Sequence, residues 1–366
     1  MSFNTVGIIG AGTMGSGIAT TLGQQGVSVR LVDTTEDAVG RGVGAARKFY
    51  DRAAEKGKMS AEDAAAAIGR ISASTDLQSL AGCDLVIEAI FEELSVKKDL
   101  FERLNPVLGA ETVVATNTSA LRVSDLAETV NDPTRFLGLH YFNPAAINPI
   151  VEVVKGEKTD QDIYDRALQF CRDTRKKPIA CKDSFGFAIN RFFVPYGNEA
   201  VRLIDEGLGS TAQIDRVARE CMDIAAGPFM VMNLVKPKIM FHAQQNLAPH
   251  GAFYALSKGL AEKGDSDYEF EIGDDASGSA DSDAVIADRL MASVFFPVLQ
   301  ELDEGVAAAA DIDMGASLAL RFGKAPCALM DHLGKAEVER IVSGIVSTYG
   351  HAMPASLTRV GSFLQG

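Results

Sequence analysis

Several features are missing from this sequence, and each absence excludes a class of protein. No run approaches 18 consecutive apolar residues, so we expect no transmembrane helix. The five cysteines are odd in number and form no CxxC pair, which argues against a disulfide framework or a zinc site. Acidic residues outnumber basic ones, 49 to 35, and this disfavours a nucleic-acid partner. A strand pattern begins by Thr5 and leaves no room for a signal peptide, so we expect a cytoplasmic protein.

The first half of the chain alternates short apolar runs with segments of helix length. Strands are expected at 5–10, 27–33, 84–90, 112–118 and 135–142. Such alternation is typical of a parallel sheet that helices cover on both faces. A further run at 149–154 follows too closely for a crossover helix, so we expect that strand to be antiparallel. We therefore predict a Rossmann-type α/β domain over residues 1–184, with a doubly wound, mostly parallel sheet.

The second half is rich in Ala, Leu and Glu and carries an internal repeat. At an offset of 98 residues, Arg191 matches Arg289, Glu206 matches Glu304, Ile214–Asp215 matches Ile312–Asp313, and Pro228 matches Pro326. The repeat predicts an all-α domain built from two copies of one helical unit, 185–262 and 285–366. The segment 263–284 is dense in Asp, Ser and Gly, so we expect an acidic, solvated linker there. An acidic interaction segment is the less favoured alternative.

A glycine-rich loop joins the first strand to the first helix. The sequence GAGTMG contains Gly10, Gly12, Thr13, Met14 and Gly15. This glycine spacing permits a tight turn, a close approach of backbone to a pyrophosphate and close packing of helix on strand. The helix N-terminus then offers N–H donors to the phosphates. Asp33 lies 18 residues after Gly15, where a carboxylate accepts the ribose hydroxyls. Because no basic residue follows Asp33 directly, NAD is favoured over NADP.

Polar side chains gather where the predicted strands end, which is the edge at which open α/β sheets bind ligands. They are Glu92, Asn117, Ser119, His140 and Asn143. Oxidising an alcohol requires a base for its hydroxyl proton, and His140 is the only histidine of the first half. Glu152 on the next strand would hold the imidazole tautomer and stabilise the imidazolium. Two plainer interpretations stay open: His140 as a structural strand histidine, and Glu152 as an outward position of an alternating strand.

Five longer stretches occur in order along the chain: GIIGAGTMGSGIA, DLVIEAIFEELSVKKDLF, ATNTSAL, RFLGLHYFNPAAINPIVEVV and KDSFGFAINRFFVPYGNEAVRLIDEG. In this order and spacing they resemble the L-3-hydroxyacyl-CoA dehydrogenase family, and the resemblance runs from residue 5 to about residue 350. It implies an enzyme of fatty-acid β-oxidation that converts an (S)-3-hydroxyacyl-CoA to the 3-oxoacyl-CoA, reversibly, with NAD. The duplicated helical part resembles the dehydrogenase half of the multifunctional fatty-acid-oxidation proteins.

The resemblance also implies catalytic roles for four residues. His140 is similar to the base that takes the 3-hydroxyl proton, and Glu152 to its partner. Ser119 matches a serine that hydrogen-bonds the substrate oxygen near the nicotinamide. Asn190 matches an asparagine that closes the site from the helical domain.

Further residues are implied to bind the cofactor. Glu92, Lys97 and Asn143 match cofactor contacts of the family, and we expect Asn117 and Ser119 to line the same crevice. Without the resemblance, Glu92 and Lys97 are ordinary solvated charges of a helix.

The CoA end of such a substrate is a polyanion, and one helical segment is strongly basic. It contains Arg41, Arg47, Lys48, Arg52, Lys56 and Lys58, opposed only by Asp51 and Glu55. Lys56 matches a CoA-contacting lysine of the family, so the resemblance implies that it binds substrate. A solvated helix face accounts for the same composition.

The chain departs from the family pattern in its first helical copy. Asn233 and Lys236 stand where the family has an acidic residue and a glycine, whereas the second copy keeps Asp331 and Gly334. The basic, glycine-rich stretch expected after the first copy is replaced by AEKGDSDYEFEIGDD. We expect the acyl or CoA environment from the helical domain to differ from that of short family members.

Two other functions remain open at this stage. One is an NAD dehydrogenase of a free hydroxy acid or sugar acid, which would not need the basic segment. The other is a non-catalytic NAD sensor or scaffold. We expect an acyl-CoA partner, and no metal, membrane or nucleic acid. Since two helical copies in one chain supply packing that a partner subunit supplies elsewhere, homodimer and monomer both stay possible.

Overall fold

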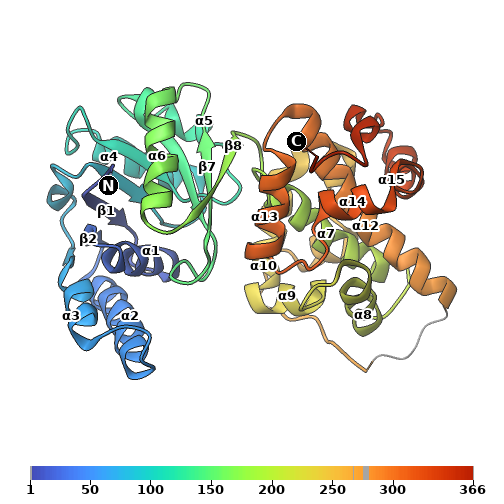
Figure 1. The fold of residues 1–366 in the computed structure, drawn as a ribbon, viewed down its shortest axis with the longest axis horizontal. Coiled ribbons are helices and arrows are strands. Elements are labelled where there is room, and N and C mark those ends of the chain that lie inside the picture. Colours follow the sequence, from blue (N-terminus) through green and yellow to red (C-terminus); the bar gives the residue numbers. More distant parts are fainter. Residues whose placement is uncertain (1, 267, 275–279, 366) are drawn as a thin grey trace. The chain divides into compact units, whose positions relative to one another are not determined.

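The computed structural model describes residues 2–266, 268–274 and 280–365. The chain divides into two compact units, residues 1–183 and 184–366 (Figure 1). A sheet with helices forms the first unit, and the second is built from helices. The predicted fold class, a Rossmann-type domain followed by an all-α part, is confirmed.

Eight strands form one sheet in the order β3-β2-β1-β4-β5-β6-β7-β8. They are β1 Thr5–Ile9, β2 Ser28–Val32, β3 Ile71–Ser74, β4 Leu85–Glu88, β5 Val113–Thr116, β6 Phe136–Tyr141, β7 Ile150–Lys155 and β8 Lys177–Lys182. Neighbouring strands are parallel except β6 and β7, which are antiparallel as predicted. The sequence does not reveal β3, because ISAS has a single apolar side chain of strand type.

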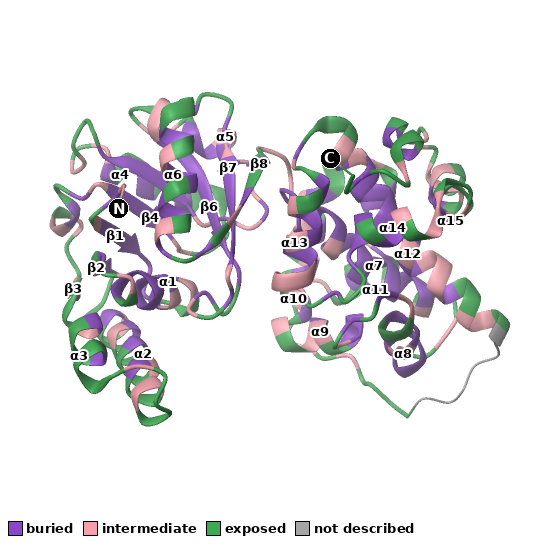
Figure 2. Cartoon of the chain, viewed as in Figure 1, coloured by how far each residue is buried: buried purple, intermediate pink, exposed green. Residues whose placement is uncertain are grey.

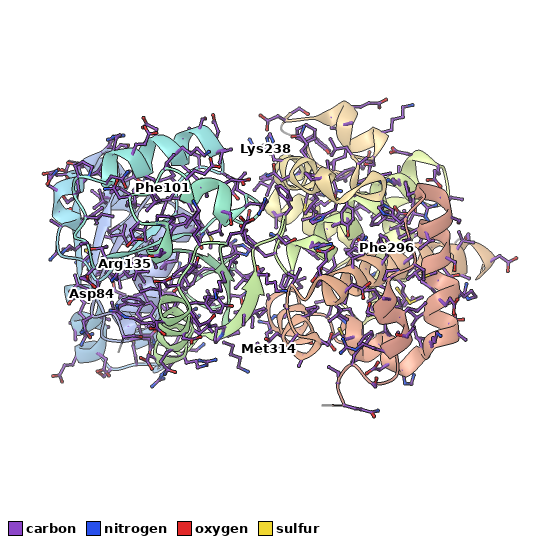
Figure 3. The ribbon with its side chains drawn as sticks, turned by 90° about the horizontal axis from the view of Figure 1, so that it is seen from above. Asp84, Phe101, Arg135, Lys238, Phe296 and Met314 are labelled. Carbon is purple, nitrogen blue, oxygen red and sulfur yellow. The ribbon has the colours of Figure 1, made fainter. Side chains whose placement is uncertain are left out.

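Helices α1 Thr13–Gln24, α2 Glu36–Glu55, α3 Ala61–Gly69, α4 Leu94–Leu104, α5 Val123–Ala127 and α6 Gln161–Asp173 accompany the sheet. Strands β4, β5 and β6 are buried along their whole length, as expected where both faces are covered (Figure 2). Phe101 of α4, labelled in Figure 3, packs edge-on against Phe136 of β6 with ring centroids 5.1 Å apart. This continuous core fixes the strand ends that carry the candidate site.

The helical unit contains two successive sets of four helices. The first is α7 Asn190–Asp205, α8 Thr211–Met222, α9 Pro228–Val235 and α10 Pro237–Leu247, followed by α11 Lys258–Lys263. The second is α12 Ala280–Glu304, α13 Ala309–Ala319, α14 Pro326–Leu333 and α15 Lys335–Tyr349. Residues matched in the sequence repeat therefore lie in corresponding helices or in the turns that join them.

The two copies contact each other through reciprocal pairs of matched residues. Arg191 binds both carboxylate oxygens of Glu304, and its counterpart Arg289 binds both oxygens of Glu206. An isolated antiparallel bridge pairs Ile224 and Phe322, which are also 98 positions apart. Reciprocal contacts of this kind are what an approximate two-fold axis produces. The copies thus pack on each other as two protomers of a symmetric dimer would.

Asp215 and Asp313 make equivalent hydrogen bonds to a helix N-terminus in the two copies. Asp215 accepts the N–H groups of the second and third residues of α9, at 2.8 and 3.1 Å. Asp313 accepts those of α14 at 2.7 and 2.8 Å. Each carboxylate thereby satisfies two N–H groups that the start of a helix leaves without a helical partner.

The segment between the copies differs from the solvated linker predicted over 263–284. α12 begins at Ala280, and Asp281 and Asp283 in its first turn favour a helix N-terminus. Upstream, Asn233 exchanges two hydrogen bonds of 2.8 Å with the main chain of Phe270. The predicted linker thus differs from the structure where α12 begins at residue 280, whereas residues 265, 266, 269 and 271–274 are exposed and lie outside any helix or strand. Residues 267 and 275–279 of the predicted linker lie outside the described residues.

The departures at Asn233 and Lys236 have a structural counterpart in the second copy. Asn233 holds residue 270, and the matched Asp331 accepts the N–H groups of Gly361 and Phe363 at 2.7 and 3.2 Å. Lys236 adopts φ of 83°, close to the 81° of the matched Gly334. That backbone region disfavours a residue with a Cβ, so Lys236 is strained where glycine would not be.

Candidate functional site

The loop between β1 and α1 has the shape that a pyrophosphate requires. Gly10 has φ of +100°, and a Cβ there would lie 2.5 Å from the Ala89 carbonyl oxygen. A Cβ at Gly15 would lie 1.8 Å from the Gly10 oxygen, whereas one at Gly12 would meet nothing within 4 Å. The first and third glycines are thus required by packing, and the second leaves backbone accessible to a ligand. Thr13 and Met14 begin α1 directly behind it.

Asp33 stands just after β2 and is bonded to this loop. Its Oδ2 accepts the Ala11 N–H at 2.7 Å, and its Oδ1 accepts the Thr34 N–H at 2.6 Å. The carboxylate is therefore fixed beside the helix N-terminus, where it can accept the hydroxyls of a ribose attached to the pyrophosphate. Loop and carboxylate together fit a dinucleotide with an unmodified ribose, which is NAD.

His140 and Glu152 face each other across the antiparallel pair β6–β7. They are partners in the strand register, and His140 Nδ1 lies 2.7 Å from Glu152 Oε2. Glu152 is fully buried and His140 is 6% exposed. A carboxylate at this distance keeps the proton on Nδ1, which places the lone pair of the neutral ring on Nε2. The sequence prediction that these residues meet is borne out by this distance, and their catalytic role stays a prediction.

Glu92 organises the turn that contains Ser119. Its Oε1 accepts the Thr118 hydroxyl at 2.6 Å and the N–H groups of Ser119 and Ala120 at 2.7 and 3.1 Å. Burial acts to raise the pKa of Glu92, but the charge of Lys97 and these hydrogen bonds hold it below the usual value. The structure thus joins two predicted site residues, Glu92 and Ser119, through one carboxylate oxygen.

Lys97 is buried behind Glu92 and meets a carboxylate that the sequence analysis missed. The Lys97 side chain is 1% exposed, with Nζ 3.3 Å from Glu92 and 2.6 Å from Glu88. The available signal was an acidic residue at the end of the apolar run DLVIE. An ionised residue among buried apolar ones needs a partner of opposite charge.

The three predicted asparagines occupy different places. Asn117 follows β5, and its Oδ1 accepts the Tyr141 N–H at 2.8 Å, which ties the ends of β5 and β6 together. Asn143 is exposed just after β6. Asn190 is the first residue of α7 in the helical unit, and its contribution to the site stays a prediction.

The basic segment coincides with α2 and the turn after it. Lys56 caps the helix, and all six cations of the segment are exposed. Within the described residues, none of these six forms an ion pair with a carboxylate. A cavity of about 420 Å³ lies between α2 and α3, and its charged lining consists of Arg47 with the carboxylates Asp51 and Glu55. The binding of an anion by this segment stays a prediction.

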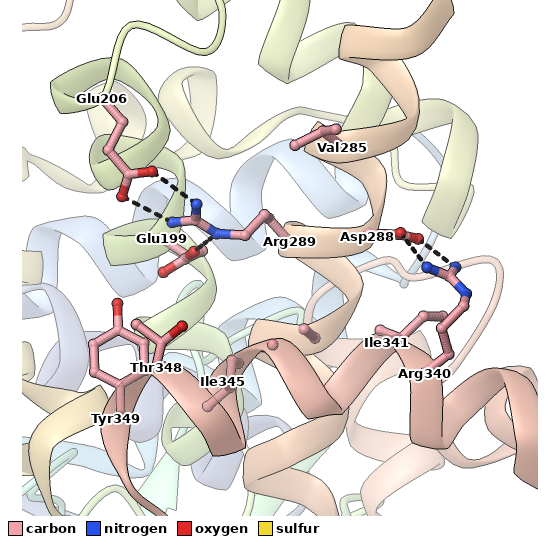
Figure 4. Close-up of a pocket in the computed structure, with 12 residues that line it drawn as sticks. Glu199, Glu206, Val285, Asp288, Arg289, Arg340, Ile341, Ile345, Thr348 and Tyr349 are labelled. Carbon is pink, nitrogen blue, oxygen red and sulfur yellow. Dashed lines mark hydrogen bonds and ion pairs between the residues drawn. The ribbon is translucent and has the colours of Figure 1, made fainter.

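Another cavity, of about 430 Å³, lies within the helical unit (Figure 4). Arg289 bonds Glu199 and Glu206 on one side, and Arg340 bonds Asp288 on the other. The charged side chains that line this cavity are all engaged in these ion pairs: Glu199, Glu206, Asp288, Arg289 and Arg340. The described residues contain no group of three or more His, Cys, Asp or Glu suited to a metal ion. No helix in the described part of the chain is long and apolar enough to cross a membrane.

Comparison with known proteins identifies relatives of both units. The NAD-binding domain model of 3-hydroxyacyl-CoA dehydrogenase matches residues 5–184, and the C-terminal domain model of that enzyme matches residues 186–266. A probable 3-hydroxybutyryl-CoA dehydrogenase of Deinococcus radiodurans is 35% identical over 229 residues, which are 63% of this chain and 82% of that one.

Solved structures agree with these matches. An (S)-3-hydroxybutyryl-CoA dehydrogenase from Ralstonia eutropha is 32% identical with a TM-score of 0.69, over 71% of this chain and 93% of that one. A 3-hydroxybutyryl-CoA dehydrogenase from Escherichia coli K12 has a TM-score of 0.86 over 100% of both chains. Its identity is 24%, so that likeness concerns the fold.

Proposed function

This chain belongs to the 3-hydroxyacyl-CoA dehydrogenase family and is an NAD-dependent oxidoreductase, and we propose that it oxidises an (S)-3-hydroxyacyl-CoA reversibly to the 3-oxoacyl-CoA. The observation that carries the proposal is the buried contact of 2.7 Å between His140 and Glu152. It lies at the carboxyl edge of the sheet that also carries the glycine loop. A base and a dinucleotide at one edge are what oxidation of an alcohol requires.

In the proposed reaction, His140 is the base that accepts the proton of the substrate hydroxyl. Nε2 takes the proton of the 3-hydroxyl while the C3–H bond breaks and the C3–O bond becomes a carbonyl. Bound NAD supplies the nicotinamide that accepts the hydride. Glu152 stabilises the imidazolium formed in this step, because its carboxylate is buried against Nδ1. In the reverse direction the imidazolium returns the proton to the oxygen.

Further residues would bind and orient the substrate. The Ser119 hydroxyl donates to Glu92 Oε1 at 3.2 Å, and it is proposed to turn and donate to the substrate oxygen instead when substrate binds. Asn190 is proposed to bind the substrate as well. Lys56 and its neighbouring cations are proposed to bind the CoA phosphates. Six exposed cations on one segment would attract the phosphates of a CoA thioester, and a free hydroxy acid carries no such polyanion.

The test is NADH oxidation with a panel of 3-oxoacyl-CoA thioesters of increasing chain length, with the free 3-oxo acids as controls. We expect turnover of at least one thioester and loss of turnover by orders of magnitude in His140→Gln, with NADH affinity close to wild type. His242→Gln, an exposed histidine of the helical unit, is the matched control and should keep wild-type turnover. Failure on every thioester overturns the substrate class, and full activity of His140→Gln overturns the base.

A further inference from the structure

Glu88 is a buried acidic residue with no role in the reaction proposed above. It ends β4 and is fully buried. Its Oε1 accepts from Lys97 Nζ at 2.6 Å and from the Ile90 N–H at 2.7 Å, and its Oε2 accepts the Thr116 hydroxyl at 2.6 Å. Both oxygens therefore have partners, which is the condition under which an ionised carboxylate persists in a protein interior.

Lys97 connects this carboxylate to the candidate site. Its ammonium lies between Glu88 and Glu92, at 2.6 and 3.3 Å. Glu92 directs its Oε2 to Lys97 and its Oε1 to the turn 118–120. The contacts thus form one chain from the interior of the sheet to the residue proposed to touch the substrate.

Stability alone does not explain this arrangement. Removing two charges from water costs several kcal/mol for each ion, and apolar residues of similar volume often stabilise a core as well or better. A buried ion pair that ends on a site turn is better explained by what it does to that turn. An ionised carboxylate accepts hydrogen bonds only, whereas a protonated one turns one oxygen into a donor. When Glu92 is ionised, its hydrogen bonds to the turn are charge-assisted and therefore stronger than those of a neutral carboxyl.

We propose that Glu88 and Lys97 are positioning residues, which keep Glu92 ionised and aimed at the turn so that Ser119 is held at the end of β5. The proposal rests on the proposed function for the consequence in catalysis. It gives Lys97 a role different from the cofactor contact that the family resemblance implies. Its ammonium acts through Glu92, and Glu88 anchors the ammonium.

The charges around Glu92 predict a pH effect. Lys97 on α4 contacts it directly, Glu88 on β4 acts through the same ammonium, and the turn after β5 contributes uncharged donors. An opposite charge within a few ångströms favours the ionised form of a carboxyl and so lowers its pKa. Without Lys97, the pKa of Glu92 should rise. The hydrogen bonds to the turn should then weaken, as pH falls, at a higher pH than in wild type.

The test variant is the double substitution Glu88→Gln and Lys97→Met. It removes both charges together, so no unpaired charge is left inside. The new amide oxygen can accept the Ile90 N–H, and the amide NH₂ can donate to the Thr116 hydroxyl oxygen. Lys97→Met alone is expected to be strongly destabilised, because Glu88 would be buried without its partner. Lys98→Met is the matched control: Lys98 is the next residue of α4 and pairs with the exposed Glu128 at 2.9 Å.

The first measurement is the pH profile of kcat/KM on the preferred 3-oxoacyl-CoA. We expect the acid limb of the double variant to shift upward by about one pH unit or more, and that of Lys98→Met to stay in place. His140 and Glu152 are unchanged in all these proteins, so a difference between them comes from the substituted residues. Adding Glu92→Gln to the double variant should abolish this upward shift of the acid limb, because an amide oxygen accepts hydrogen bonds without titrating. Activity lowered equally at every pH indicates a merely structural role and overturns the proposal.

A second measurement does not depend on the reaction. In protein labelled with ¹⁵N at serine and alanine, the Ser119 and Ala120 amide signals should be constant in wild type between pH 5 and 8. In the double variant they should titrate. Signals that move together in both proteins, or in neither, overturn the positioning role. Titrating amides in an enzyme that turns over no thioester would instead retain the positioning role and refute the proposed function.

Discussion

Replacing Glu152 by glutamine tests the proposed catalytic pair most directly. Glutamine has nearly the same volume, and Glu152 is fully buried, so the substitution changes charge more than packing. The carboxylate lies 2.7 Å from His140 Nδ1, and a hydrogen bond to a charged group contributes about 1.5–3 kcal/mol. If that contribution is realised when the imidazolium forms, its loss lowers kcat by about 10- to 150-fold.

The direction of this effect has a second cause. An amide at position 152 can present either its oxygen or its NH₂ group to Nδ1. The oxygen keeps the proton on Nδ1 but loses the charge. The NH₂ group donates to Nδ1, so the ring proton moves to Nε2, and the base loses the lone pair that it needs. Both arrangements lower the rate.

The assay is steady-state reduction of NAD with a saturating (S)-3-hydroxyacyl-CoA, the direction in which the imidazolium forms, together with NADH affinity measured by fluorescence. NADH affinity should stay near wild type, because the glycine loop and Asp33 lie next to β1, α1 and β2. In the strand order, β4, β5 and β6 separate β1 from β7. Glu157→Gln is the control: that carboxylate lies two residues after β7 and is 70% exposed, paired with Arg122. A kcat within twofold of wild type in folded Glu152→Gln protein would refute the reasoning.

Two further predictions concern charged side chains elsewhere in the sheet unit. Lys56→Ala should raise KM for the thioester by about fivefold with kcat little changed, because an exposed charge pair contributes up to about 1 kcal/mol, and Arg172→Ala on α6 should leave both constants unchanged. Burial lowers the pKa of Lys176 from 10.5 to about 8, although its Nζ donates to the Ala145 and Asn148 carbonyls. The unfolded chain therefore binds more protons between these values, and wild-type stability gains up to about 3 kcal/mol from this group as pH rises from 8 to 10.5. Denaturant unfolding of wild type and Lys176→Met at pH 7.5 and 10 checks this, and an equal pH dependence in the two proteins contradicts it.

Local pattern was sufficient for the fold class and for the glycine loop. Apolar runs alternating with helical segments predict a parallel sheet because side-chain period and burial are properties of short segments. The same holds for Gly10 and Gly15, whose backbone and packing demands only glycine meets. The repeat is also a property of the sequence, and the structure shows matched Asp215 and Asp313 in equivalent contacts.

The site itself depended on contacts between distant residues. That Glu152 faces His140 follows from the β6–β7 register, and a slip of one residue would turn its side chain to the other face of the sheet. Glu88 was missed because the sequence does not show which cation pairs with an acidic residue in an apolar run. In the structure that cation is Lys97 of α4. Composition predicted a linker over residues 263–284 and could not show that Asn233 would bind the main chain of Phe270 within it.

The sequence alone therefore determined which elements form and where the glycine-rich loop lies, since those depend on residues close together in the sequence. Tertiary structure decided which charges meet, because a buried charge is tolerated only where the fold brings its partner within about 3 Å. For this protein the two levels join at Ser119. The sequence places it after β5, and the Glu88–Lys97–Glu92 contacts hold its turn in one geometry.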